Sequence, residues 1–112
     1  MLKRANRIVG AEDYRTTVRK GRRFSTPNAL IYVFSQQVAV PTRFGFIVAK
    51  TVGNSVTRNL VTRRLRSIGA EFVRSQPTGK DVVIRALPGS AGVSWSTLQS
   101  EILTSLERSA AL

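Results

Sequence analysis

Short apolar runs alternate along the chain with longer stretches of helical periodicity. Residues 29–34 and 43–49 are rich in β-branched and aromatic side chains, and we expect two strands that pair antiparallel across the polar stretch containing Pro41. An extended piece at residues 23–25 is expected to add an edge strand. Residues 81–87 have the same apolar character and predict a further strand.

Three segments have the spacing of amphipathic helices. Residues 11–20 begin with two acids, end with two cations and are followed by glycine, which predicts a short helix with a favourable dipole. Residues 55–73 predict the second helix and residues 96–109 the third, with Ser96 and Gln99 as a capping box. The apolar stripes of these two helices comprise Val61, Leu65, Ile68 and Phe72, and Trp95, Leu98, Ile102 and Leu106.

This order predicts an α+β fold in one small domain: helix, strands, helix, strand, helix, with a mixed sheet of about four strands packed against the helices. The length of 112 residues suits one domain spanning residues 1–112. Residues 1–8 are expected to form a basic N-terminal tail and residues 110–112 a frayed C-terminus. Four aromatic residues are assigned to the core: Phe44, Phe46, Phe72 and Trp95.

Charge adds a functional expectation, because 18 Lys and Arg against 6 Asp and Glu give a net charge of +12. No acidic residue lies between Asp13 and Glu71, so the positive charge is concentrated in that part of the chain. Such a field favours polyanions, and arginine, which outnumbers lysine here, suits bidentate phosphate contacts. We therefore expect a nucleic-acid partner, the alternative being a merely solvated basic face.

The residue types that are missing exclude much enzyme chemistry. The chain contains no cysteine and no histidine, so it has no disulfide, no thiolate metal site and no imidazole base. The basic N-terminus lacks the apolar core of a signal peptide, and no window approaches about 18 consecutive apolar residues. We expect a cytoplasmic, soluble protein with no membrane partner.

A joined motif occupies residues 43–66. A strand ends in Ala-Lys-Thr at 49–51, the loop Val-Gly-Asn-Ser-Val follows at 52–56, and a helix opens with Arg-Asn-Leu at 58–60. This motif resembles that of the bacterial ribonuclease P protein subunit, in which the corresponding pieces read Ser-Lys-Lys, Val-Gly-Asn-Ala-Val and Arg-Asn-Arg. The resemblance spans nearly the whole chain.

Further positions match the family, and some depart from it. The pair Asp13-Tyr14 corresponds to the family's Asp-Phe, and Tyr32 matches in the first long strand. Four residues depart from the pattern: Leu60 replaces an arginine, Thr62 and Thr51 each replace a lysine, and Val18 replaces an aromatic residue.

The resemblance implies a subunit of an endoribonuclease, ribonuclease P, whose partners are a catalytic RNA and precursor tRNA, with no DNA expected. It implies Mg²⁺-dependent hydrolytic removal of the 5′ leader, which forms the mature tRNA 5′ end. The Mg²⁺ would be held mainly by the RNA partner, and catalysis would come from the RNA, with no catalytic protein side chain. The basic segment agrees, because it offers neither histidine nor carboxylate for a metal or a proton.

Two RNA-binding surfaces are expected. The first is the side of the middle helix away from its apolar stripe, together with the preceding loop, and we assign to the catalytic RNA the residues Lys50, Arg58, Asn59, Arg63 and Arg66. The second lies on the sheet beside the first helix, resembles the family's leader-binding cleft, and comprises Tyr14, Val18, Tyr32, Arg15 and Arg19. The alternatives are a solvated helix face and ordinary core-edge tyrosines. Arg64 lies nearer the apolar stripe, and its role is left open.

Three other classes of protein compete with this interpretation. The joined motif at 50–66 disfavours a ribosomal protein or another structural RNA binder. A stand-alone nuclease needs clustered acids to hold metal, whereas the six acids here are split between the two ends of the chain. The strand content disfavours a DNA-binding helix-turn-helix protein.

Overall fold

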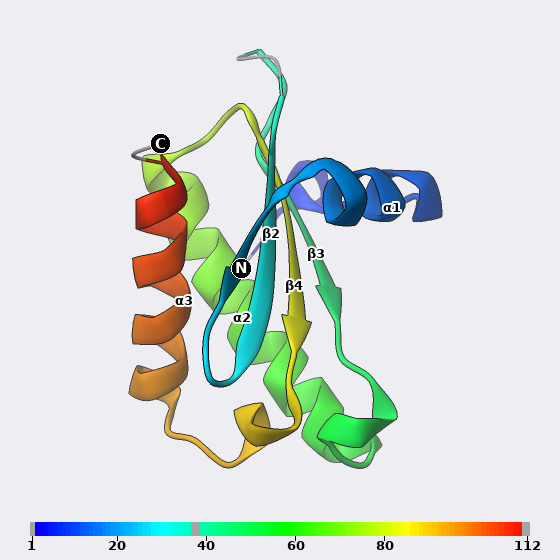
Figure 1. The fold of residues 1–112 in the computed structure, drawn as a ribbon, viewed down its shortest axis with the longest axis vertical. Coiled ribbons are helices and arrows are strands. Elements are labelled where there is room, and N and C mark those ends of the chain that lie inside the picture. The colour runs from blue at the N-terminus through cyan, green and yellow to red at the C-terminus, as the bar shows by residue number, and fades with distance from the viewer. Residues whose placement is uncertain (1, 37–38, 111–112) are drawn as a thin grey trace.

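The structure, a computed structural model, describes residues 2–36 and 39–110. One four-stranded sheet has the order β1-β2-β4-β3 (Figure 1). Its strands are β1 (Arg22–Ser25), β2 (Ala29–Ser35), β3 (Arg43–Ile47) and β4 (Lys80–Ala86). The helices are α1 (Ala11–Lys20), α2 (Ser55–Ser75) and α3 (Trp95–Ala110), with short 3-10 turns η1 (Arg4–Asn6), η2 (Lys50–Val52) and η3 (Pro88–Ala91). The expected fold class and element order are confirmed, including the edge strand β1.

The predicted pairing of β2 with β3 is wrong, because β4 lies between them. β4 pairs antiparallel with β2 and parallel with β3. The crossover through α2 brings the chain back to form this parallel pair, as in other strand-helix-strand units. Val82, Val83 and Ile84 are fully buried, and an uninterrupted apolar run is typical of a strand covered on both faces.

The main core lies between the sheet and the helices α2 and α3. The predicted stripe of α2 is buried there, as are Leu98, Ile102 and Leu106 of α3. Burial of an aliphatic side chain of this size contributes about 1.5–3 kcal/mol. Phe44 of β3 meets Phe72 of α2 edge to face, with ring centroids 6.0 Å apart.

A second, smaller apolar cluster lies on the opposite face of the sheet, under α1. It contains Ile8, Tyr32 and Val83, with Tyr14 and Val18 of α1 packed against it. α1 therefore covers one face while α2 and α3 cover the other, as Figure 1 shows. The part of this sheet face that α1 does not cover is therefore bordered by α1.

Helix ends follow local hydrogen bonds. Asn54 caps α2, since its side-chain oxygen accepts a hydrogen bond from the backbone N–H of Thr57 at 2.9 Å. The capping box predicted at Ser96 and Gln99 is wrong: Ser94 accepts from the N–H of Thr97 at 3.2 Å. The Gln99 amide instead donates to Glu71 on α2.

The two ends of the chain differ in how much the structure describes. Of the predicted N-terminal tail at residues 1–8, Leu2 and Ile8 are buried, and Ile8 donates its backbone N–H to the Phe44 carbonyl at 2.9 Å. The predicted frayed end at 110–112 lies outside the described residues except for Ala110, the last residue of α3.

None of the described helices combines the length and apolarity that crossing a membrane requires.

Candidate nucleic-acid interface

The side of α2 that faces away from the sheet carries a polar, cationic hollow. Its volume is about 470 Å³, and it is lined by Val56, Asn59, Thr62, Arg63 and Arg66. The spacing of three, four and seven residues places these side chains together on one side of the helix. Three of the five residues predicted to meet a catalytic RNA are thus brought together: Asn59, Arg63 and Arg66.

Lys50 lies in η2, just before α2, and is exposed. The turn back toward the helix requires Gly53, whose φ of 155° lies in the region that favours glycine. A Cβ at Gly53 would come within 2.9 Å of two Thr57 side-chain carbons. This glycine therefore lets Asn54 cap α2 and keeps Lys50 at the helix N-terminal end.

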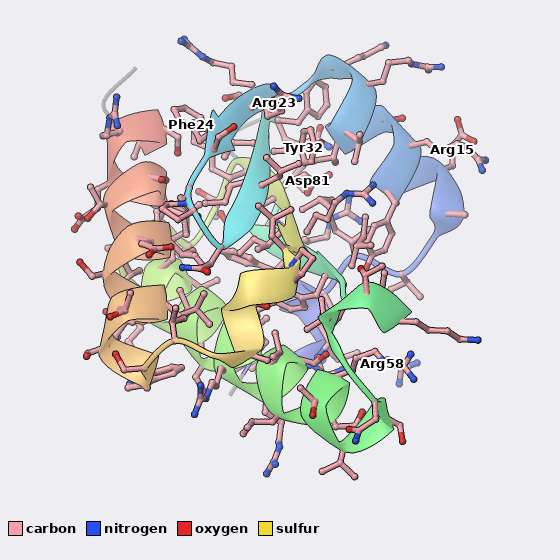
Figure 2. All side chains as sticks on the ribbon, turned by 60° about the horizontal axis from the view of Figure 1, so that its bottom comes forward. Arg15, Arg23, Phe24, Tyr32, Arg58 and Asp81 are labelled. Carbon is pink, nitrogen blue, oxygen red and sulfur yellow. The ribbon has the colours of Figure 1, made fainter. Side chains whose placement is uncertain are left out.

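Arg58 does not share the open side of α2. It precedes Leu65 by seven residues, so it lies almost in line with the buried stripe. Its Nε atom is buried and has no hydrogen-bond partner within the described part of the chain. Figure 2 shows Arg58 at the N-terminal end of α2. The stem of Arg58 up to Nε thus belongs to the packing, and a partner can be reached only by its Nη atoms.

Arg64, whose role the sequence left open, is anchored beside α3. Its Nη1 donates to the carbonyl of Val93 at 3.4 Å, and the side chain is half-buried. It therefore lies apart from the hollow formed by Asn59 and Arg66.

Few of the cations are neutralised internally. The ion pairs within residues 2–36 and 39–110 involve only two cationic side chains, Arg15 and Arg43. The arginines of α2 are in none of them. An unpaired cationic helix is suited to contact phosphates, whose neutralisation dominates protein affinity for nucleic acids.

The second predicted surface is a shallow cleft between α1 and the ends of β3 and β4. Its volume is about 350 Å³, with an apolar floor and cationic rims. The lining residues are Tyr14, Arg15, Val18, Arg19, Ile47 and Arg85. Four of the five predicted leader-binding residues are therefore brought together here.

Tyr32, the fifth, lies in the apolar cluster under α1. It is only 9% exposed and does not line the cleft. Tyr14 is the tyrosine at the surface, and its hydroxyl accepts a hydrogen bond from the N–H of Phe46 at 3.2 Å. Gly45 makes this possible, because a Cβ there would come within 2.5 Å of the Tyr14 ring. Tyr14, and not Tyr32, is thus the tyrosine that lines the cleft.

Sequence reasoning missed Ile47 and Arg85. Arg85 is exposed and is the direct neighbour of both Leu30 on β2 and Ile47 on β3. The period-two alternation of β4 puts Arg85 on the same face as Val83. That signal was present in the sequence, but the assumed pairing of β2 with β3 left no place for β4 beside the cleft.

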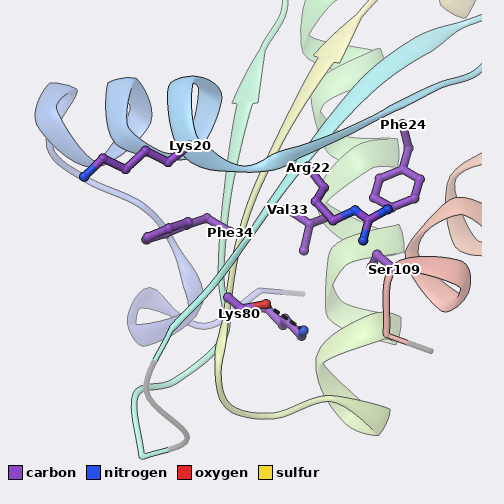
Figure 3. A pocket seen from close by; sticks show the side chains of 8 residues that line it. Lys20, Arg22, Phe24, Val33, Phe34, Lys80 and Ser109 are labelled. Carbon is purple, nitrogen blue, oxygen red and sulfur yellow. Dashed lines mark hydrogen bonds between the residues drawn. The ribbon is translucent and has the colours of Figure 1, made fainter. Parts of the chain in front are cut away.

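A third cationic hollow was not predicted at all. It lies where α1 ends and β4 begins, and Figure 3 shows Lys20, Arg22 and Lys80 around Phe34. Lys80 donates to the Ser35 hydroxyl at 3.1 Å, and none of the three cations forms an ion pair within the described chain. A cationic hollow with an aromatic wall can accept a phosphate and an adjoining base.

The carboxylates do not form a metal site. Asp81 is bound to Arg43, Glu12 to Arg15, and Glu101 to the Asn28 amide at 3.0 Å. Within residues 2–36 and 39–110 there is no group of three or more His, Cys, Asp or Glu side chains that could hold a metal ion. These donors do not fit a Mg²⁺ ion bound by the protein alone, and we assign no chemical step to a metal on this chain.

Comparison with known proteins gives a consistent result. A family model described as Ribonuclease P matches residues 2–110. The ribonuclease P protein component of Clavibacter michiganensis subsp. michiganensis is 47% identical over 108 residues, which are 96% of each chain. That of Kocuria rhizophila is 42% identical over 114 residues, covering 98% of this chain and all of the relative.

Solved structures with the same fold are also similar. A Staphylococcus aureus RNase P protein, a mutant with defective mRNA degradation activity, has a TM-score of 0.83 at 22% identity, covering 95% of this chain and 89% of that one. The RNase P protein from Thermotoga maritima has a TM-score of 0.78 at 20% identity, covering 91% and 96%. At this level of identity the likeness concerns the fold.

Proposed function

Since this chain belongs to the ribonuclease P protein family, we propose that it binds the catalytic RNA of ribonuclease P through α2 and the 5′ leader of precursor tRNA through the cleft beside α1. Family membership makes it part of an endoribonuclease complex of tRNA processing, with the ribonuclease P RNA as its partner. The observation that carries the proposal is the presence of two separate cationic surfaces of different chemistry on one small domain.

The α2 surface suits a folded RNA. Arg63 and Arg66 stand one turn apart beside the Asn59 amide, so they can contact neighbouring phosphates while the amide reaches a sugar or a base edge. Folded RNA is recognised largely by shape and by contacts to phosphates and 2′-hydroxyls. Mixed polar donors on a rigid helix provide such contacts without reading a sequence.

The cleft beside α1 suits a single strand. Tyr14, Val18 and Ile47 form an apolar floor on which an unpaired base can stack, and Arg19 and Arg85 can follow the backbone. Stacking tolerates any base, as a partner for many different leaders requires. Tyr32 supports this floor from the cluster beneath α1.

The remaining part of the proposal concerns chemistry. Mg²⁺ would be held mainly by the RNA partner, and the RNA would catalyse hydrolysis, because the carboxylates of this chain are scattered and largely engaged with Arg, Asn and Gln side chains. The protein would contribute binding energy and screening of phosphate repulsion between catalytic RNA and substrate.

Reconstitution tests this function. The protein is added to bacterial ribonuclease P RNA and precursor tRNA at a low Mg²⁺ concentration, and release of the 5′ leader is followed on a gel. We expect cleavage to increase with protein concentration up to one protein per RNA. Cleavage by the protein without RNA, or no stimulation of the RNA by the protein, would overturn the proposal.

A further inference from the structure

A second hollow on α2 adjoins the surface proposed for the catalytic RNA but differs from it in chemistry. It lies between α2 and the start of α3, has a volume of about 500 Å³, and is lined mostly by apolar atoms. Its lining residues are Leu60, Arg63, Arg64, Ser67 and Trp95. Arg63 also lines the polar hollow with Asn59 and Arg66, so this residue forms the ridge between the two.

The apolar walls are unusual for a solvated helix face. Leu60, which lines this hollow, is 38% exposed, and Val56, one turn before it in the adjoining hollow, is 76% exposed. The Trp95 indole packs one side against the main core and is only partly covered. An exposed leucine opposite a half-buried indole, with arginines at the margin, indicates a surface that a partner covers.

Charge selects the kind of partner. Arg63 and Arg64 form no ion pair within residues 2–36 and 39–110, and Arg64 is held at the margin by its bond to the Val93 carbonyl. The next acid along α2, Glu71, lies about two turns beyond Arg64 and accepts from Gln99. With a net charge of +12, the field opposes a second copy of this chain and favours a polyanion.

We propose that this hollow holds an unpaired base of the catalytic RNA, stacked on Trp95 against Leu60, with Arg63 and Arg64 on the adjoining phosphates. This inference rests on the proposed function and deepens it, because it adds an aromatic base-binding site to a surface that otherwise offers polar contacts. Flat bases stack on aromatic rings without strong sequence preference, and arginine at the edge adds phosphate contacts.

Tryptophan fluorescence reports the proposed contact directly, because Trp95 is the only tryptophan of the chain. Ribonuclease P RNA is titrated into the full-length protein, and the emission is compared with complex formation on a native gel. We expect the emission to be quenched in proportion to binding. A fully paired RNA duplex should bind at low salt without quenching, since it presents no unstacked base.

Two matched variants separate the ring from its bulk. Trp95→Phe keeps an aromatic surface, whereas Trp95→Leu keeps an apolar side chain without one. We expect Trp95→Leu to weaken binding to the catalytic RNA about 10-fold and Trp95→Phe much less. The salt dependence of binding should stay unchanged in both, because no phosphate contact is removed. Thermal unfolding verifies that both variants are folded.

The outcomes are distinguishable. If the native protein fails to bind the catalytic RNA, the proposed function fails, and this inference fails with it. If binding and its salt dependence are intact but the Trp95 emission is unchanged and Trp95→Leu binds like the native protein, only the base-binding site is rejected. Emission that changes with protein concentration in the absence of RNA would instead assign the hollow to self-association and overturn the inference.

Discussion

The guanidinium of Arg43 makes two hydrogen bonds to the carboxylate of Asp81, from Nε to Oδ1 at 3.0 Å and from Nη2 to Oδ2 at 2.7 Å. The two residues face each other across the parallel strands β3 and β4, and Asp81 is almost fully buried. Arg43 also reaches Asp13 of α1 at 3.4 Å. Hydrogen bonding to Asp81 raises the pKa of the Arg43 guanidinium above its ordinary value. Arg43 therefore links the buried Asp81 of β4 to Asp13 of α1.

Removing the charge of Asp81 should destabilise the fold. In Asp81→Asn the partly buried Arg43 loses its main opposite charge and one of two hydrogen-bond acceptors. We expect a loss of about 3 kcal/mol, the lower end for a broken buried pair, because Arg43 keeps Asp13. Urea unfolding measures the change. The exposed pair of Arg15 with Glu12 supplies the control, since Glu12→Gln should change stability far less. Equal stability of the native and Asp81→Asn proteins would contradict a structural role for the pair.

Loss of Arg63 and Arg66 should weaken binding to the catalytic RNA and reduce its salt dependence. A plot of log affinity against log salt concentration has a negative slope, and each lost phosphate contact should reduce its magnitude by about 0.7–0.9. Filter binding at several salt concentrations measures the slope. Arg108→Ala, at an exposed position of α3, is the matched control and should leave the slope unchanged. A slope unaltered in Arg63→Ala/Arg66→Ala would reject the α2 surface.

Arg58→Ala should lower the stability of the fold, because the stem of Arg58 is packed.

The cleft beside α1 should distinguish precursor from mature tRNA. We expect Arg19→Ala combined with Arg85→Ala to weaken affinity for precursor tRNA more than for mature tRNA, because only the precursor carries a leader. Both side chains are exposed, so folding should be unaffected, whereas Tyr32→Ala would also disturb the buried cluster. Affinities of the reconstituted complex for both tRNAs measure the effect, and equal losses on the two would remove the leader from this cleft.

Protonation of Glu12 should make the stability contributed by its ion pair with Arg15 in α1 depend on pH. A hydrogen bond from Arg15, and then its charge, lower the pKa of Glu12 below its ordinary 4.5. Because the folded-state pKa is the lower one, the pair contributes stability above pH 4.5, and this contribution disappears as the pH falls through the folded value. The native protein should therefore unfold at a slightly higher temperature than Glu12→Gln at pH 7, and this difference should shrink as the pH is lowered below 4.5. A difference that does not shrink as the pH falls below 4.5 would contradict this origin.

The positions of helices and strands were predicted from the sequence better than the order in which the strands pair. Hydrophobic periodicity located the strands and the helices α2 and α3 to within about two residues, because buried positions recur differently in strands and helices. The terminal charges and Gly21 located α1. Periodicity could not place β4 between β2 and β3, because strand order depends on long-range pairing and on the crossover through α2. That error also hid Arg85 from the predicted cleft.

The candidate site was predictable where a motif and a helix face agree. Asn59, Arg63 and Arg66 lie together as expected. Arg58 was placed on the open side, although its heptad relation to Leu65 could have shown that its stem lies beside the core. Tyr32 was predicted to lie at a binding surface but is buried, whereas Trp95 was assigned to the core but is partly exposed. Strand alternation and helical spacing predict on which side of an element a residue lies. They do not predict how completely α1 or α3 covers that residue.

The central place of β4 also has a consequence for synthesis on the ribosome. β2 and β3 are made early, but β2 can pair only with β1 until residues 80–86, which join β2 to β3, have been synthesised. A nascent chain that ends before this strand cannot close the sheet, so it has neither the floor beside α1 nor the support beneath α2. RNA-binding competence should therefore arise in one step, late in translation, once β4 has left the exit tunnel.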